Sequence, residues 1–406
     1  MKNVKLKAKN VRIVFLLLLA AYGLSLTAHA QLAIKGETVW TMSGEPIKDG
    51  VVLVNAGKIE AVGSSSNIKI PANYTVVSAK VVTPGLIDAH TVIGLNGYLN
   101  QPHDQMALDG SGPMQPELRA IDAYNADERL ISWVREFGVT TIHTGHQPSA
   151  LISGQTMIAK TWGKDVDEAT IVPTAMIMVT LGEEGLAGQG KSPGTRAKAI
   201  AMLRGELIKA QENVKKADPP KDLRSVAMMS VVKRDIPLLI NANKAQDIIA
   251  ALHLAKEFNL KIVLDGAADA QLVMDDIIAA GVAVIIHPTM ARPSGDMNGV
   301  SMETAGKLKA AGIPVALQSG YEGYVPKTRV ILYEAGMAAQ NGVSQRDALA
   351  LITIDAAKIL GLDKRIGSLE VGKDADLALY DGDPLEWSTH CVGTIINGVQ
   401  VSKVTR

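Results

Sequence analysis

From about Gly85 onward, over roughly 280 residues, short apolar runs rich in β-branched residues alternate with longer segments in which apolar residues recur at spacings of three and four. The short runs predict buried strands, and the longer segments predict amphipathic helices. Strands that alternate with helices form parallel sheets, because a parallel crossover needs a connection of helix length. About eight such units fit the α/β class and a (β/α)8 TIM barrel.

The pattern is clearest in two helices and five strands. The helices are predicted over Thr195–Lys216 and Lys244–Phe258. The strands are predicted over Thr140–Thr144, Leu238–Ala242, Lys261–Leu264, Val282–Ile286 and Pro314–Gln318. In such a barrel the chemistry takes place at the C-terminal ends of the strands, so the residues that end these runs are the candidates for function.

Both ends of the chain have the pattern of hairpins. Residues 32–80 contain "VVLVNAGKIEAVG" with a turn signal at Asn55-Ala56-Gly57, and the last forty residues contain "LALYDGDP" and "GTIINGVQV". An isolated hairpin is only marginally stable in water, so neither end is expected to fold alone. We therefore predict one composite β-sandwich domain from residues 31–80 and 366–406, with the barrel spanning 81–365.

Residues 1–30 have the features of a secretory signal peptide. A lysine-rich start leads into the apolar run Ile13–Leu26, and Ala28-His29-Ala30 offers a cleavage site. The run is shorter than the ~20 residues that a membrane helix needs, although an uncleaved anchor stays the alternative. We expect a mature protein that begins at Gln31, is exported to the periplasm or secreted, and has no membrane segment after cleavage.

The charge balance excludes several classes of partner. Lys plus Arg and Asp plus Glu each number 41, so the net charge is zero and neither nucleic acid nor an anionic membrane is favoured as partner. No Gly-x-Ser-x-Gly elbow is present, and "GLAGQGKSPGT" matches a phosphate loop poorly. The expected partner is a small-molecule ligand or substrate.

Two motifs carry a resemblance to a known family. "VVTPGLIDAHT" at the first predicted barrel strand and "IGSLEVGKDADLALYDGDPLE" near the C-terminus resemble the amidohydrolase superfamily, in its imidazolonepropionase-like secreted branch. The resemblance covers nearly all of the mature chain. It implies hydrolysis of C–N bonds in amides, cyclic imides or dipeptides, with one or two divalent metals at the C-terminal mouth of the barrel.

The metal positions that this resemblance implies are altered in the sequence. The family ends its first barrel strand in His-x-His, whereas this chain has His90-Thr91-Val92. The family's His-Ala-His is replaced by Asn241-Ala242-Asn243, its next histidine position by Asp265-Gly266, and its aspartate turn by Gln318-Ser319-Gly320. Tight zinc sites need three or four good ligands, so we expect less than about one tightly held divalent metal per chain.

Some metal-binding capacity could remain at His90 and Glu183, which would hold zinc weakly. Glu183 stands in "LGEEGLAG", where related proteins have an acidic segment, and Lys160 could have been a bridging group in an ancestral site. His143 and His146 offer a relocated site only if their loop folds back. For each of these residues a structural or surface role is the alternative.

The best candidate for a general base is His287, which follows a predicted strand and precedes a proline. Asp265 at the end of the preceding strand could orient it, and a histidine fixed by hydrogen bonds in a turn is the alternative. Asn241, Asn243 and Gln318 suit a polar pocket that holds carbonyl or hydroxyl groups.

Three functions remain open at this stage. The chain could be an exported hydrolase of non-peptide C–N bonds with an unusual site. It could be a catalytically silent paralogue that binds a small ligand. It could also be a silent subunit, in a homo-oligomer or in a hetero-oligomer with an active relative, since the resemblance implies assembly. An impaired metal centre is predicted for all three, including the hydrolase.

Overall fold

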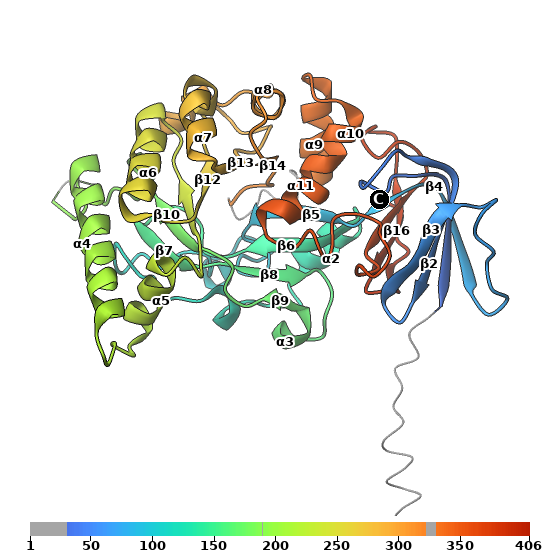
Figure 1. The fold of residues 1–406 in the computed structure, drawn as a ribbon, viewed down its shortest axis with the longest axis horizontal. Coiled ribbons are helices and arrows are strands. Elements are labelled where there is room, and N and C mark those ends of the chain that lie inside the picture. Colours follow the sequence, from blue (N-terminus) through green and yellow to red (C-terminus); the bar gives the residue numbers. More distant parts are fainter. Residues whose placement is uncertain (1–30, 189, 322–329) are drawn as a thin grey trace, which may run out of the picture.

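The computed structural model describes residues 31–188, 190–321 and 330–406 (Figure 1). The predicted signal peptide lies outside these residues. Within them, no helix combines the length and the apolar character needed to cross a bilayer. The described strands form sheets of seven, six and four strands.

The seven-stranded sheet is built from both ends of the chain, in the order β17-β16-β15-β4-β1-β2-β3. β4 and β15 pair antiparallel, with Leu377 opposite Pro84 and Tyr380 opposite Val81. Figure 1 shows these first and last strands, in blue and red, together at one end of the molecule. The strands are β1 (Leu32–Val39), β2 (Ile47–Asn55), β3 (Lys58–Ser64), β4 (Thr75–Pro84), β15 (Leu377–Tyr380), β16 (Cys391–Ile396) and β17 (Val399–Ser402).

This sheet is continuous, which differs from a sandwich of two separately hydrogen-bonded sheets. β4 pairs with β1 along one edge and with β15 along the other, so the C-terminal strands extend the N-terminal sheet. Apolar side chains from both ends, among them Ile34, Leu379 and Ile395, share one buried cluster. The domain boundaries at residues 80 and 366 stay predictions, and β4 itself continues to Pro84.

The remaining strands form a ring. β5 pairs parallel with β6, and β10 to β14 pair parallel in chain order. The Ala89 N–H donates to the Leu317 carbonyl over 3.3 Å, and Thr91 forms a parallel bridge with Gly320, so β5 meets the end of β14. The strands are β5 (Leu86–Thr91), β6 (Val139–Thr144), β10 (Ile177–Thr180), β11 (Leu238–Asn241), β12 (Ile262–Gly266), β13 (Ala283–Ile286) and β14 (Val315–Ala316).

All five strands predicted in the barrel are confirmed in position, and only β14 is clearly shorter than predicted. One part of the ring differs from eight parallel strands. β8 (Met157–Lys160) runs antiparallel to β6, and β7 (Ile152–Gln155) runs antiparallel to β10. The seven residues 145–151 before β7 contain no helix, and a parallel crossover needs about a dozen residues or more. β9 (Thr170–Val172) extends this part by pairing with β8.

Helices pack against the outside of the ring. The two predicted helices are confirmed as α4 (Arg196–Lys215) and α6 (Ala245–Phe258), and the Thr195 side chain caps α4 by accepting from the Lys198 N–H. Their apolar faces share one cluster with the outward side chains of the strands. The other α-helices are α2 (Arg129–Arg135), α3 (Val166–Ala169), α5 (Leu223–Val232), α7 (Met274–Ala280), α8 (Thr304–Ala310), α9 (Ile331–Gln340), α10 (Gln345–Leu351) and α11 (Ile354–Ile359).

The interior of the ring is filled at its N-terminal end by one apolar layer. β5, β8 and β10 to β14 contribute side chains to it, and residues of α11 and the following turn pack against the same layer. The strand residues of this layer are Ile87, Ala89, Ile158, Met178, Leu239, Val263, Ile285 and Ala316. The ring is therefore a packed core, and room for chemistry remains only above this layer.

Candidate functional site

A second, polar layer lies directly above the apolar one. Side chains two residues apart on a strand point to the same face, so the residue two positions beyond each inward apolar residue also points inward. Leu239 is followed in this way by Asn241, and Val263 by Asp265. Ile285 and Ala316 are followed in the same way by His287 and Gln318. All four of these polar residues are buried.

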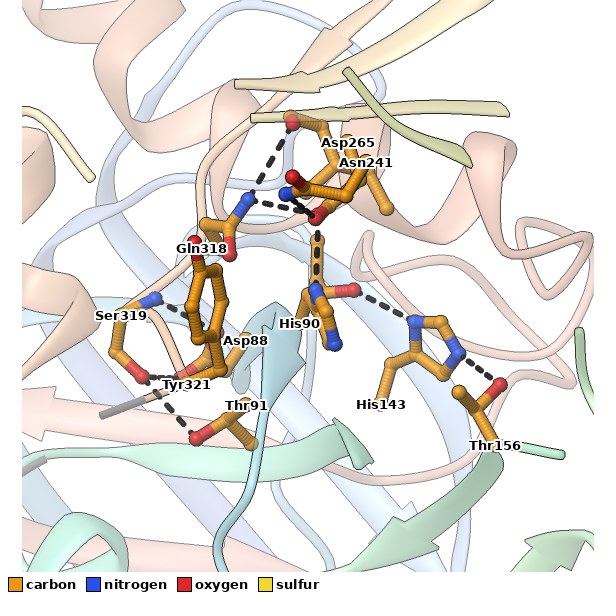
Figure 2. A network of polar contacts seen from close by, with 12 residues as sticks. Asp88, His90, Thr91, His143, Thr156, Asn241, Asp265, Gln318, Ser319 and Tyr321 are labelled. Atoms are coloured by element: carbon orange, nitrogen blue, oxygen red, sulfur yellow. Dashed lines mark hydrogen bonds and ion pairs between the residues drawn. The ribbon is translucent and has the colours of Figure 1, made fainter. Parts of the chain in front are cut away.

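Asp265 is the centre of this layer. One carboxylate oxygen accepts the Nδ1–H of His90 at 2.8 Å and the Nε2–H of Gln318 at 2.9 Å. The other accepts the Nδ2–H of Asn241 at 2.7 Å (Figure 2). Side chains from three other strand ends thus converge on one fully buried carboxylate.

The surroundings of Asp265 keep it ionised. Burial alone raises the pKa of the carboxyl, but the adjacent His90 and the three side-chain hydrogen bonds outweigh that effect and lower the pKa below its ordinary value. An ionised carboxylate can only accept hydrogen bonds, so Nδ1 of His90 carries a proton and the amide nitrogens of Asn241 and Gln318 face Asp265.

His90 lies in β5, whereas Val92 follows the last residue of that strand. The register between β5 and β6 shifts between Asp88 and Thr91, where β5 carries one extra residue, and β5 ends at Thr91. The alternation that would place residue 92 beside His90 therefore stops. Val92 is buried in the large apolar cluster with Ile93. The Nε2 atom of His90 is buried and has no hydrogen-bond partner among the described residues.

His143 is a hydrogen-bonded structural neighbour of His90. The two ring centroids lie 5.9 Å apart. The Nδ1–H of His143 donates to the Ala89 carbonyl at 2.7 Å, and Nε2 lies 2.7 Å from the Thr156 hydroxyl, which can donate to it (Figure 2). Burial lowers the pKa of His143 to about 3, so the ring is neutral. His146 is also buried, and neither ring nitrogen has a partner among the described residues.

Asn241 and Asn243 are held by their own contacts. The Asn243 Nδ2–H donates to Asn241 Oδ1 at 3.3 Å, and the Ala268 N–H lies 3.4 Å from Asn243 Oδ1. Gly266 has a φ of +73°, and a Cβ there would lie 2.6 Å from Asn243 Oδ1. A larger side chain at position 266 would therefore displace the asparagine pair.

The predicted pairing of His287 with Asp265 is not observed. The Nδ1–H of His287 donates to the Pro288 carbonyl at 2.8 Å, and its Nε2 lies 3.3 Å from the Thr304 hydroxyl. Burial lowers the pKa of this ring. The turn after β13 supplies these partners, which matches the structural alternative for His287, while Asp265 is occupied by groups from other strands.

Glu183 does not join His90. It lies at the start of a 3-10 helix (Glu183–Gly185), and its backbone N–H donates to Asp296 Oδ2 at 2.6 Å. Arg196 binds that same oxygen at 2.8 Å and forms a bidentate pair with Asp247. Glu183 therefore belongs to a cluster that ties together the loops after β10 and β13 and the start of α6.

Lys160 lies away from the mouth, at the junction with the seven-stranded sheet. Its Nζ lies 3.2 Å from Asp374 and also contacts Asp376, and all three side chains are buried. Lys58 and Arg365 pair with Asp374 at 2.6 and 2.8 Å. This lysine holds two parts of the fold together and is not part of the polar layer.

The sequence reasoning missed Asp88 and its partner. The Asp88 carboxylate accepts the backbone N–H of Ser319 at 3.1 Å and the Ser319 hydroxyl at 2.5 Å (Figure 2). Burial raises the pKa of Asp88 to about 6, against the lowering effect of these hydrogen bonds. The contact joins β5 to the segment after β14, where the ring closes. A buried acidic residue two positions before His90 was the available signal.

The donor set does not fit a tightly bound divalent metal. Such an ion needs several lone pairs directed at one point. In the polar layer, N–H groups of His90, Asn241 and Gln318 point at Asp265 instead. Among the described ranges, no group of three or more His, Cys, Asp or Glu residues could hold a metal ion.

Comparisons with known proteins agree on one family. The model of the amidohydrolase family matches residues 200–402. The imidazolonepropionase of Fusobacterium nucleatum is 24% identical over 389 residues, covering 85% of this chain and 88% of that protein. The imidazolonepropionase of Sphingopyxis alaskensis is 25% identical over 400 residues, covering 88% and 95%. A solved amidohydrolase from Thermotoga maritima has a TM-score of 0.87 at 27% identity, covering 92% of this chain and 100% of that chain.

Proposed function

Because the chain belongs to the amidohydrolase family, we propose that it uses the family's barrel mouth to bind a small polar ligand without a tightly held divalent metal. Hydrolysis of amide or cyclic imide C–N bonds would then be weak or absent. Within the three functions open from the sequence, this is the silent paralogue that binds a ligand.

The proposal rests on one observation, that both carboxylate oxygens of Asp265 accept hydrogen bonds from neighbouring side chains. Metal-assisted hydrolysis requires nitrogen and oxygen lone pairs around an ion with one open position for water. In this chain His90, Asn241 and Gln318 each donate an N–H to the Asp265 carboxylate. Amide nitrogens have no lone pair to offer a metal, and amide oxygens are weaker ligands for zinc than imidazole.

Support also comes from the two residues that the sequence left as metal ligands. Glu183 is bound into the Arg196 cluster through its backbone, while His90 is held by Asp265. Neither residue belongs to a group of three or more possible ligands among the described residues. Fewer than three good ligands are too few for a zinc site that survives dialysis.

Elemental analysis of the mature protein tests this proposal. Protein produced with zinc in the medium is dialysed and measured by mass spectrometry, beside hydrolysis assays on acyl-amino acids and cyclic imides. We expect less than about one divalent metal per chain. We also expect hydrolysis that does not change in His90→Ala or in the exposed control His103→Ala.

The proposal would be contradicted by one zinc per chain together with hydrolysis that is lost in His90→Ala and kept in His103→Ala. The remaining histidines His143, His146 and His287 would then be the first to examine as ligands. Unchanged thermal stability after chelator treatment is the second expected result, because a metal that binds only the native state stabilises it.

A further inference from the structure

A groove on the outside of the ring lies between α6 and α7, which Figure 1 shows side by side. Arg234, Leu260 and Val282 line it, and they precede β11, β12 and β13 in the chain. The polar layer lies at the opposite ends of these same strands, so the groove is separate from the mouth of the ring. Its volume is about 600 Å³, which is in the range of small-molecule sites.

Much of the wall of this groove is apolar. Leu252, Leu260 and Val282 are buried beneath it, Ile249 is half-buried, and Ala280 is exposed beside it. A molecule that covers these side chains removes apolar surface from water, which favours binding. The groove therefore suits a ligand with an apolar body.

Arg234 stands in a backbone position that usually belongs to glycine. It follows α5, and its φ is +66°. The Arg234 N–H donates to the Val231 carbonyl at 2.9 Å, and the Asp235 N–H donates to the Ser230 carbonyl at 3.0 Å. These two bonds form a helix-ending turn in which a left-handed glycine is the common residue. A side chain at this φ has a cost in stability, so the turn itself does not require an arginine.

The Arg234 side chain is fixed at the end of α6. Its Nη1 group donates to the Asn259 backbone carbonyl at 2.7 Å and to Asn259 Oδ1 at 2.8 Å. The side chain has no other hydrogen bond or ion pair among the described residues. The N–H groups of Nε and Nη2 remain, and together they can bind both oxygens of one carboxylate.

The charges around the groove favour an anion at the same end. Lys256, in the last turn of α6, also lines it and has no ion pair among the described residues. Asp276 is the only carboxylate among the described residues that line the groove, and it lies in the first turn of α7. Because α6 and α7 each connect parallel neighbouring strands, they run in the same direction. Asp276 therefore lies toward the other end of the groove from Arg234.

We propose that this groove binds a small organic acid with an apolar body. The carboxylate pairs with Nε and Nη2 of Arg234 beside Lys256, and the body packs against the apolar wall. This site goes beyond the ligand binding proposed for the mouth and does not depend on it.

Three probes test the proposal on the mature protein. 4-Phenylbutyrate has both the carboxylate and the apolar body. 4-Phenylbutyramide has the same shape without the charge, and acetate has the charge without the body. Isothermal titration calorimetry measures the three dissociation constants. We expect 4-phenylbutyrate to bind at least about tenfold more tightly than either of the other probes.

Two variants locate the site. Arg234→Gly removes the guanidinium and gives the turn its commonest residue, so the fold is expected to stay and the preference for the acid over the amide to disappear. Ala280→Phe fills the groove from an exposed position of α7 and should weaken binding of the acid at least about tenfold. Ala201→Phe, at an exposed position of α4, is its control and should leave binding unchanged. Circular dichroism checks the fold of each variant.

Equal binding of the acid and the amide, or no binding of the acid, would overturn the proposal. Acid binding that is unchanged in Arg234→Gly or in Ala280→Phe would also overturn it, because the acid would then bind elsewhere. None of these measurements involves metal content or hydrolysis. Their outcome is therefore independent of the function proposed for the mouth.

Discussion

Val92 shows why a single position does not restore a metal site. In the sequence it stands where the family has its second histidine, but in the structure it lies in the apolar cluster beyond the end of β5. The His90 ring lies in the polar layer and donates to Asp265. Because the two side chains have different surroundings, we expect that a histidine at position 92 would not bind an ion together with His90.

We therefore predict that Val92→His destabilises the protein without adding zinc. Burying an imidazole among apolar side chains with no partner should lower the free energy of unfolding by about 1–3 kcal/mol. Urea unfolding and zinc analysis of the same sample measure both effects. Val92→Ala is the control, since it removes volume at that site without adding a polar group. A rise to one zinc per chain in Val92→His would show that position 92 faces the mouth.

At the scale of elements, β8 connects the ring to the seven-stranded sheet through Lys160. The lysine ends β8, and its two carboxylate partners, Asp374 and Asp376, directly precede β15. All three side chains are buried. Removing one member of a buried ion pair leaves the other charge uncompensated in a medium of low dielectric constant.

Lys160→Met should therefore lower the free energy of unfolding by about 3–5 kcal/mol. Lys164→Met, at an exposed position in the following loop, is the control and should change it by less than about 0.5 kcal/mol. Denaturant unfolding followed by circular dichroism gives both values. An effect of Lys160→Met no larger than that of the control would show that the buried network does not hold the two elements together.

At the scale of the whole molecule, the same network makes stability depend on pH. Burial raises the pKa of Asp374, but the charge of Lys160 and the hydrogen bonds from Lys58 and Arg365 outweigh burial and lower it. A carboxyl whose pKa is lower in the folded state stabilises that state above the unfolded pKa of about 4. This contribution is lost as the pH falls through the folded pKa.

We accordingly expect the stabilisation that Asp374 provides, measured as the difference in melting temperature between the unaltered protein and Asp374→Asn, to be nearly constant from about pH 7 to pH 5 and to shrink below about pH 4. Asp374→Asn should be less stable at neutral pH and should lose less on acidification. Scanning calorimetry of both proteins across this range, with the exposed Asp167→Asn as control, measures the difference. A parallel fall in Asp374→Asn and the unaltered protein would assign the acid sensitivity to other groups.

Sequence pattern alone placed five strands of the ring, β6 and β11 to β14, and the helices α4 and α6, because periodicity of two and of 3.6 is local. It also placed Asn241, Asp265, His287 and Gln318 at strand ends, since each follows an apolar run that must be buried. The family resemblance rested on two short motifs, and both lie in regular strands or their turns. Local spacing is enough for statements of this kind.

Tertiary structure alone decided which of these strand ends meet. Asp265 accepts hydrogen bonds from His90, Asn241 and Gln318 and not from His287. β13 pairs directly with β12, but the His287 ring has its own partners in the Pro288 carbonyl and the Thr304 hydroxyl. Tertiary structure also made β7 antiparallel to β10 and β8 antiparallel to β6. It placed Lys160 between the ring and the seven-stranded sheet, where it contacts Asp374 and Asp376. Contacts between residues far apart in the chain depend on ring order, strand direction and bulges, and none of these leaves a periodic mark in the sequence.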